Sequence, residues 1–152
     1  MNIEKVTALP DGISKLATES TVQGFRFVER LISEFTQGKN RFDGDGEALF
    51  AAYLDGELVG IGGVNQDPYR CNADIGRVRR LYVMNHARSL GVGKALMQEI
   101  EQHASQYFDE LQLFTDTSAA ANFYSALGYS PVGLENISHQ KALVKQPITA
   151  SG

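Results

Sequence analysis

The segment that decides the fold is Arg88-Ser89-Leu90-Gly91-Val92-Gly93-Lys94. An apolar run that ends in Leu81-Tyr82-Val83 precedes it, and a helical apolar pattern follows it from Gly91 to about Gln106. Two glycines at a helix start let the backbone approach a ligand closely, and the first helical N–H groups have no partner within the helix. The segment therefore predicts a binding site for a phosphate group, to which Arg88 and Lys94 add positive charge.

Two familiar phosphate-binding loops do not fit this segment. A Walker loop needs a glycine at the position of Arg88 and a Ser or Thr at the position of Ala95. A dinucleotide-binding loop needs a third glycine where Leu96 stands, and a preceding strand much nearer the start of the fold. Neither nucleotide loop explains the two glycines.

Helices and strands alternate on both sides of the segment, which is typical of an α/β fold. After it we expect a strand, a helix that stops at Gly128 and two further strands, over Leu111–Phe114, Ser118–Leu127, Tyr129–Val132 and Lys141–Lys145. Before it we expect a first strand over Met1–Ala8, a turn at Pro10–Gly12 that leads into a helix, and a second helix over Gly24–Gly38. A β-hairpin around Asp55-Gly56-Glu57, formed by Ala48–Leu54 and Leu58–Val64, and a further strand over Ile75–Val83 follow.

The composition indicates one domain and excludes several classes of protein. The chain has 152 residues, 43% of them hydrophobic, which suffices for a single core; we expect a domain over residues 1–145 and a flexible tail over residues 146–152. A net charge of −4 argues against nucleic acid or an anionic membrane as the main partner. The single cysteine, Cys71, forms no intrachain disulfide and fits a reducing cytoplasm. No signal peptide or membrane span is predicted.

The segment Arg88 to Gly93 resembles the acyl-CoA loop of the GNAT N-acetyltransferase superfamily, whose pattern is Gln or Arg, two residues, Gly, one residue, then Gly or Ala. Phe123-Tyr124 followed by Leu127-Gly128-Tyr129 is similar to the late helix of that family. Two motifs in the right order are more specific than one. The resemblance implies a mixed, twisted sheet of six to seven strands flanked by about four helices. Its central parallel strands, ending at Val83 and Phe114, would splay apart.

The resemblance also implies acetyl-CoA as co-substrate, no metal, and roles for named residues. Backbone groups of Leu81 and Val83 would hold the pantetheine arm in the wedge between the splayed strands, and the Val83 N–H would stabilise the oxyanion. The pyrophosphate would lie on a run of N–H groups, with Arg88 and Phe123 completing the cofactor site: Ser89, Leu90, Gly91, Val92, Gly93 and Lys94. Tyr124 matches the tyrosine that acts as general acid; the alternative is that it only packs beside Phe123.

The acceptor side departs from the family pattern. Many relatives place a glutamate, the general base, where this chain has Arg77, and an arginine cannot serve as that base. Arg77, Arg79 and Arg80 indicate either a proton path through water or an acceptor that carries its own carboxylate. The alternative is that alternation sends Arg80 to one face and Arg77 and Arg79 to the other, where they pair with acids or solvent. Phe27 and Tyr69 are further candidates for the acceptor pocket.

The sequence thus predicts direct transfer of an acetyl group from acetyl-CoA to a primary amine of a small molecule. Acetylation of a protein N-terminus or lysine is one alternative, and a CoA-binding module without turnover is another. The acceptor, the acyl length and the choice between monomer and homodimer stay open. His86, His103 and His139 are too scattered to predict a metal site.

Overall fold

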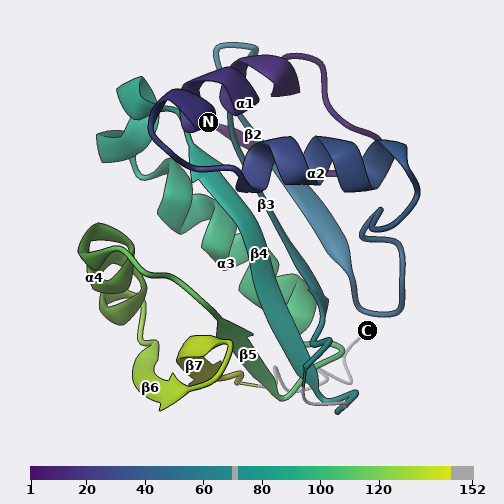
Figure 1. Cartoon of the computed structure of the whole chain (residues 1–152), viewed down its shortest axis with the longest axis vertical. Coiled ribbons are helices and arrows are strands. Elements are labelled where there is room, and N and C mark those ends of the chain that lie inside the picture. Colours follow the sequence, from purple (N-terminus) through teal and green to yellow (C-terminus); the bar gives the residue numbers. More distant parts are fainter. Residues whose placement is uncertain (70–71, 145–152) are drawn as a thin grey trace, which may run out of the picture.

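The computed structural model describes residues 1–69 and 72–144 (Figure 1). Its elements follow the expected order: β1 (Asn2–Val6), α1 (Ile13–Val22), α2 (Phe27–Thr36), β2 (Ala48–Leu54), β3 (Glu57–Gln66), β4 (Ile75–Val83), the 3₁₀ helix η1 (Asn85–Leu90), α3 (Val92–Ala104), β5 (Glu110–Leu113), α4 (Ser118–Ala126), β6 (Ser130–Leu134) and β7 (Ile137–Ala142). In the described part of the chain, none of the helices has the length and hydrophobicity needed to span a bilayer.

Seven strands of the described residues form one mixed sheet in the order β1-β2-β3-β4-β5-β7-β6. Only β4 and β5 are parallel. The predicted β2–β3 hairpin is confirmed, and Asp55 and Gly56 both have positive φ, 50° and 80°. A two-residue turn of this kind matches the natural twist of the two strands, which is why an Asp-Gly pair is found there. The predicted fold class, a mixed sheet with four flanking helices, is confirmed.

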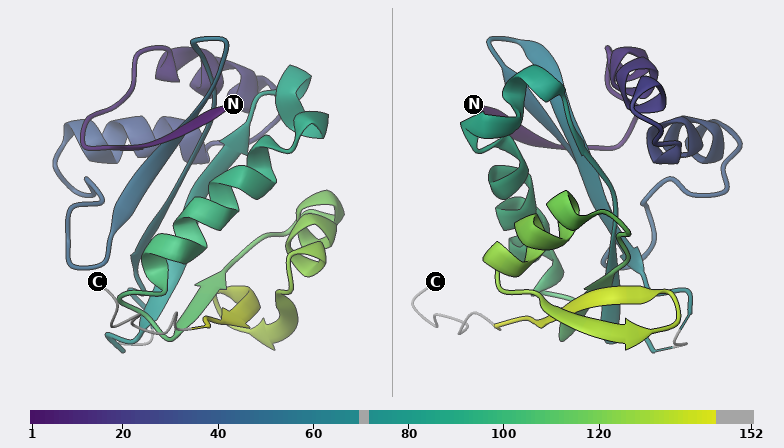
Figure 2. Two further views of the ribbon diagram at one scale, coloured as in Figure 1. Left: turned by 180° about the vertical axis from the view of Figure 1, so that it is seen from behind. Right: turned by 60° about the vertical axis from the view of Figure 1, so that its left-hand side comes forward.

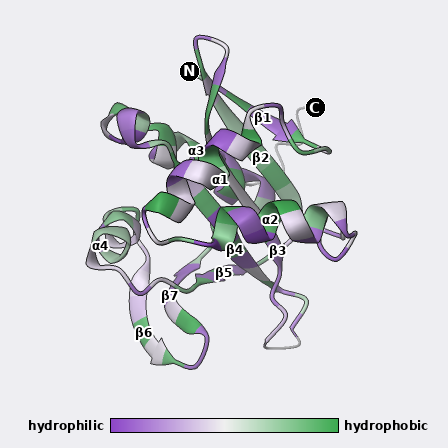
Figure 3. Ribbon diagram, turned by 45° about the horizontal axis from the view of Figure 1, so that its top comes forward, coloured by the Kyte–Doolittle hydropathy of each residue, from purple (hydrophilic) through white to green (hydrophobic). Residues whose placement is uncertain are grey.

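Helices cover both faces of the sheet and create two cores. The right panel of Figure 2 shows α3 on one face and α1 with α2 on the other. The α3 core contains Leu96, Met97 and Ile100, whereas the α1/α2 core contains Leu16, Leu31 and Leu49; all six side chains are buried. In Figure 3, β2 is almost wholly hydrophobic, as a strand covered on both faces must be, whereas α2 has mixed colouring.

The two central parallel strands diverge, as predicted. Residues 75–77 of β4 pair with residues 110–112 of β5, after which β5 ends at Leu113 while β4 continues to Val83. Figure 1 shows the two strands separating toward α4. The expected strand end at Phe114 is one residue too late, since that side chain is 58% exposed beyond the strand. The divergence opens a wedge beside the second half of β4.

A β-bulge in β4 corrects the expected alternation of its arginines. The register changes from Gly63 opposite Arg79 to Ile61 opposite Tyr82, so β4 contains one extra residue there, and Arg80 has a φ of 62°. An extra residue reverses the alternation of side chains along the strand. Arg80 therefore points to α2, where it pairs with Glu34, and the prediction that Arg80 lies on the face opposite Arg77 and Arg79 is wrong.

The last strand was also misplaced by the sequence pattern. Lys141–Lys145 was expected, but β7 spans Ile137–Ala142 and pairs with both β5 and β6. The central residues of β7 are polar, so hydrophobicity does not reveal the strand; its pairing with two neighbours fixes it. Lys145, the expected tail over residues 146–152 and Cys71 lie outside the described residues.

Candidate active site

The segment between β4 and α3 has the geometry of a phosphate-binding helix start. The 3₁₀ helix η1 leads into Gly91, whose φ of 81° is left-handed and favours glycine, and the first helical bond runs from Ala95 N–H to Gly91 O at 3.0 Å. The N–H groups of Val92, Gly93 and Lys94 precede that bond and have no partner within the helix. Space around the Gly91 Cα is open. The start of α3 can therefore receive an anion.

The backbone of Val83 faces the wedge between the splayed strands. Met84 N–H donates to Val59 O at 2.7 Å, so hydrogen-bonded pairs alternate along β3 and β4 and the Gly60–Val83 pair is a non-hydrogen-bonded one. The N–H and C=O groups of Val83 therefore point away from β3, to the side where β5 has ended. Leu81 lies at the β-bulge, where the regular alternation of β4 is interrupted. Val83 thus presents its backbone N–H to the wedge, while its carbonyl oxygen accepts a hydrogen bond from Arg88 Nε at 2.9 Å.

Phe123 brings the two predicted motifs together. A Cβ atom on Gly93 would lie 3.2 Å from the Phe123 ring and 3.7 Å from the Val83 side chain. Thus α4, the start of α3 and the end of β4 meet at one point, although Gly93 and Phe123 are far apart in the sequence. A side chain at position 93 would press on the Phe123 ring, so a small residue is favoured here.

Tyr124 lies next to this point and is buried. Its ring packs edge-on against Phe123 at 5.1 Å and Tyr129 at 5.6 Å, and tilted toward His139 at 6.4 Å. Burial raises the pKa of Tyr124, so the phenol stays protonated at neutral pH. Within residues 1–69 and 72–144, no group makes a hydrogen bond with its hydroxyl. The hydroxyl is therefore available as a donor to a ligand.

Glu19 of helix α1 accepts hydrogen bonds from the end of β4 and from the first residue of η1. The Tyr82 hydroxyl donates to Glu19 Oε2 at 2.7 Å, and Asn85 N–H donates to both carboxylate oxygens at 3.1 and 3.2 Å. Burial, and then the bond to Glu19, raise the pKa of Tyr82 to about 12, so this phenol also stays protonated. Glu19 thereby caps the first turn of η1 and fixes where the segment between β4 and α3 begins.

Arg88 is held beside the wedge by the same helix. Its Nη2 donates to Gln23 Oε1 at 2.6 Å, its Nε donates to Val83 O at 2.9 Å, and its guanidinium lies 5.3 Å from the centre of the Tyr82 ring. The side chain is exposed. Arg88 thus places a positive charge at the end of the wedge that lies next to the start of α3, where its exposed side chain can exchange hydrogen-bond partners.

At the closed end of the wedge, Arg77 is part of a buried ion pair. Its Nη1 lies 3.6 Å from Asp67 Oδ1, and the two side chains are 7% and 0% exposed. Arg77 also donates to the carbonyl oxygen of Asn136, and its guanidinium lies 4.5 Å from the centre of the Tyr69 ring. Burial, and then the nearby Arg79, lower the pKa of Arg77. Two predicted acceptor residues, Arg77 and Tyr69, are therefore in contact.

The other two predicted acceptor residues lie further along β4. The ring of Phe27, at the start of α2, lies tilted against two other rings, 6.1 Å from that of Tyr82 and 5.7 Å from that of Phe25. Arg79 is half-buried on the face covered by α1 and α2. Thus Phe27 and Arg79 share the face of the sheet that the helices α1 and α2 cover, next to the Arg80–Glu34 pair.

Sequence reasoning missed the polar partners that shape this face. Glu19, Gln23 and Glu34 come from helices, where nothing in the apolar pattern marks a polar side chain as a partner of a distant strand. Gln112 is also buried, in register with Arg77, and its Oε1 has no hydrogen bond within the described residues. Tyr82 stands in the apolar run of β4, where a tyrosine is a signal of a buried polar contact; its bond to Glu19 is such a contact.

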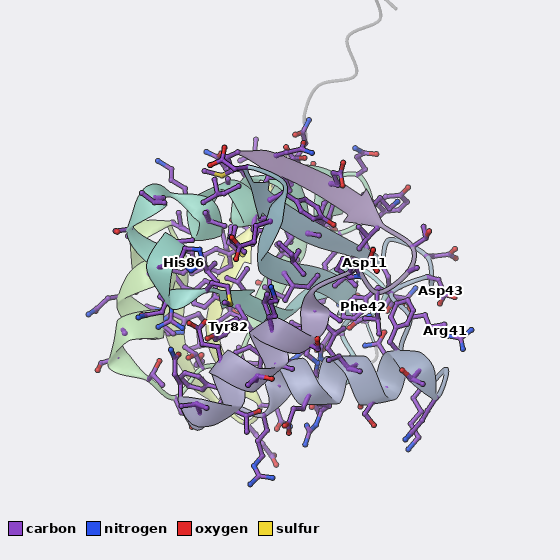
Figure 4. All side chains as sticks on the ribbon, turned by 90° about the horizontal axis from the view of Figure 1, so that it is seen from above. Asp11, Arg41, Phe42, Asp43, Tyr82 and His86 are labelled. Atoms are coloured by element: carbon purple, nitrogen blue, oxygen red, sulfur yellow. The ribbon has the colours of Figure 1, made fainter. Side chains whose placement is uncertain are left out.

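A separate cavity lies at the other end of α3. Its volume is about 740 Å³ and its lining includes Lys5, Arg41, Asp43, His103 and Tyr107. Figure 4 shows Arg41 and Asp43 on the opposite side of the molecule from Tyr82 and His86. Among the described residues, no cluster of three or more His, Cys, Asp or Glu side chains could hold a metal ion.

Solved structures with the same fold are acetyltransferases. A protein from Exiguobacterium sp. 255-15 that is assigned as an acetyltransferase is 33% identical, with 93% of this chain and 92% of that chain covered and a TM-score of 0.83. Aminoglycoside 6'-acetyltransferase type Ii is 22% identical, with 97% and 100% covered and a TM-score of 0.69. Ribosomal-protein-alanine N-acetyltransferase from Brucella melitensis is 17% identical, with 94% and 100% covered and a TM-score of 0.66.

The fold with its splayed strands defines the class as an α/β acyltransferase. The model of the acetyltransferase (GNAT) domain matches residues 45–131, more than half of the 152 residues. The chain belongs to the GNAT acetyltransferase family. A comparison with curated protein sequences gave no significant match.

Proposed function

We propose that this protein transfers an acetyl group from acetyl-CoA to the primary amine of a small-molecule acceptor, directly and in a ternary complex. The observation that carries the proposal is the meeting of three elements at the wedge. The backbone of Val83 faces it, Gly93 at the start of α3 touches Phe123, and the buried Tyr124 lies beside them.

Acetyl-CoA would supply a reactive thioester, and the residues present fit its shape and charge. The pyrophosphate suits the N–H groups from Ser89 to Lys94, with Arg88 close by. The pantetheine amides suit the backbone of Val83, which faces the wedge like the edge of a sheet, and by the family resemblance that of Leu81. Phe123 covers the start of α3 on the side of α4.

Two groups would assist the transfer, one at the carbonyl oxygen of the acetyl group and one at the sulfur of CoA. The N–H of Val83 is aimed into the wedge and would donate to the carbonyl oxygen as negative charge develops on it. The Tyr124 hydroxyl would donate its proton to the departing thiolate, whose conjugate acid has a pKa of about 8.5 by analogy with cysteine. Burial raises the pKa of Tyr124, which keeps the phenol protonated but also makes it a weaker acid, so its proton would move toward the sulfur only as negative charge develops on the departing thiolate.

The attacking amine must first lose a proton, because an alkylammonium has a pKa of about 10. Arg77 occupies the position of the usual glutamate and is already paired with Asp67. A water molecule that reaches the open side of the wedge is the simplest proton acceptor, as the sequence suggested. We also propose a cytoplasmic location for the protein, where thiols stay reduced.

Two alternatives are separated by their acceptors. One protein of the same fold is named as acting on an aminoglycoside and another on a ribosomal-protein alanine, so the fold occurs with both small-molecule and protein acceptors. A CoA-binding module without turnover is the third candidate. The Tyr124 hydroxyl, which makes no hydrogen bond with the described residues, and its proximity to the meeting point of β4, α3 and α4 support an enzyme over a module.

The test is acetyl-CoA titration by calorimetry, followed by thiol release with a panel of small amines and N-terminal peptides. The expected result is cofactor binding and thiol release that is fastest with a small amine. Faster release with a peptide would replace the proposed acceptor class by a protein N-terminus. Binding without release by any amine would establish the module instead, and absence of binding would refute the proposal altogether.

A further inference from the structure

Three arginines of β4 lie on one face of the sheet, which is the face covered by α1 and α2. Arg79 pairs with Gly63, and a Cβ atom on Gly63 would lie 2.6 Å from the ring of Phe42 in the α1/α2 core. Residues directly opposite each other in an antiparallel pair point to the same face. Arg79 therefore faces α1 and α2, and the bulge turns Arg80 to the same side.

Two of these three charges are already neutralised. Arg77 pairs with Asp67, and the Arg80 Nη2 bonds Glu34 Oε1 at 3.0 Å. The described part of the chain gives Arg79 no ion pair. Three cations therefore share two acids along one strand.

The surroundings increase the excess of positive charge. Arg30 lies one helical turn before Glu34 on α2, is exposed, and has no ion pair within the described residues either. Burial is the main cause of the lowered pKa of Arg80, and the positive charges of Arg79 and Arg30 contribute to it. Arg79 and Arg30 are thus close enough to Arg80 to repel its charge. An anion bound beside Arg79 would relieve this repulsion.

We propose that Arg79, assisted by Arg30, binds the carboxylate of the acceptor, so that the substrates are amines that carry a carboxylate. This inference rests on the proposed acetyl transfer and gives its substrate class. It also moves the anion site away from Arg77. That guanidinium is buried against Asp67 and Tyr69, whereas Arg79 is half-buried and lies on the face of the sheet that α1 and α2 cover.

The test compares matched acceptors that differ only in the carboxylate. ω-Amino acids of increasing length are paired with alkylamines of the same length, because Arg79 and Val83 lie four residues apart, at most about 13 Å along a strand. For the best pair, we expect kcat/KM to be roughly 30-fold higher for the carboxylated amine, as one charge-assisted hydrogen-bonded pair implies. Arg79→Gln removes this preference, mainly through KM. Arg41→Gln, a distant surface arginine, retains it.

Equal kcat/KM for both members of every pair in the wild-type protein would overturn the inference while leaving acetyl transfer intact. A preference that survives in Arg79→Gln would also overturn it. If no amine releases thiol, the proposed function fails, and calorimetry with the same pairs in the presence of CoA decides the inference separately. Tighter binding of the carboxylated member that is lost in Arg79→Gln supports it; equal binding refutes it. Circular dichroism shows whether Arg79→Gln folds, and Arg79→Lys, which keeps the charge, partly restores the preference.

Discussion

The substitution Tyr124→Phe tests the proposed role of Tyr124 as general acid separately from its role in packing. The Tyr124 hydroxyl makes no hydrogen bond with the described residues, and its ring contacts with Phe123, Tyr129 and His139 do not need the oxygen. Replacing it by phenylalanine conserves shape, so we expect the free energy of unfolding to change by less than about 1 kcal/mol. Loss of a general acid lowers the rate by a factor of about 100 or more. The variant should therefore lose turnover while it retains stability.

The assay is thiol release from acetyl-CoA at saturating acceptor, together with urea unfolding and acetyl-CoA calorimetry. The matched control is Tyr129→Phe, because the Tyr129 hydroxyl donates to Glu101 Oε2 at 2.9 Å and lies in the same aromatic cluster. Removing that bond should cost about 1–2 kcal/mol of stability and leave kcat within about twofold. A Tyr124→Phe protein with unchanged kcat would refute the assignment of Tyr124 as general acid. Equal loss of kcat in both variants would indicate that the cluster only packs.

Three further predictions concern the cofactor segment, the buried ion pair and pH. Arg88→Ala should raise the dissociation constant of acetyl-CoA about tenfold in calorimetry, since it removes a charge from the phosphate end, whereas Arg41→Ala should not; equal effects would remove Arg88 from the site. Asp67→Asn leaves the buried Arg77 without its counterion and should lower the free energy of urea unfolding by about 3 kcal/mol; a loss below about 1 kcal/mol would contradict the buried pair. Burial and then Lys5 lower the pKa of His103 from 6.5, so the unfolded chain binds the proton more readily. Stability should be constant above pH 6.5 and fall as the pH drops from 6.5 toward the lower pKa of the folded state, and His103→Gln should flatten this fall.

The donor half of the site was predictable from sequence because its signals are local. A positive φ favours glycine at position 91 and the close Phe123 ring favours a small residue at position 93, and a short sequence pattern contains both. The Phe123-Tyr124 pair is equally local. Hairpin chemistry at Asp55-Gly56 is read in the same way.

The acceptor half was not predictable because its geometry depends on distant partners. No local pattern announces the bulge that turns Arg80 to α2, and the partners Glu34 and Asp67 come from a helix and a loop. Strand alternation therefore gave the wrong face for Arg80. The polar strand β7 was missed for a similar reason, since pairing with β5 and β6 and not hydrophobicity holds it in the sheet.

We propose that acetyl-CoA lies in the wedge beside Val83 and on the start of α3. A titration of ¹⁵N-labelled protein with acetyl-CoA, followed by amide chemical shifts, tests it residue by residue. If acetyl-CoA binds there, the largest shifts belong to the amides of Leu81, Val83, Phe123 and the run from Ser89 to Lys94. Shifts confined to Lys5, Asp43 and His103, around the cavity at the far end of α3, would contradict it.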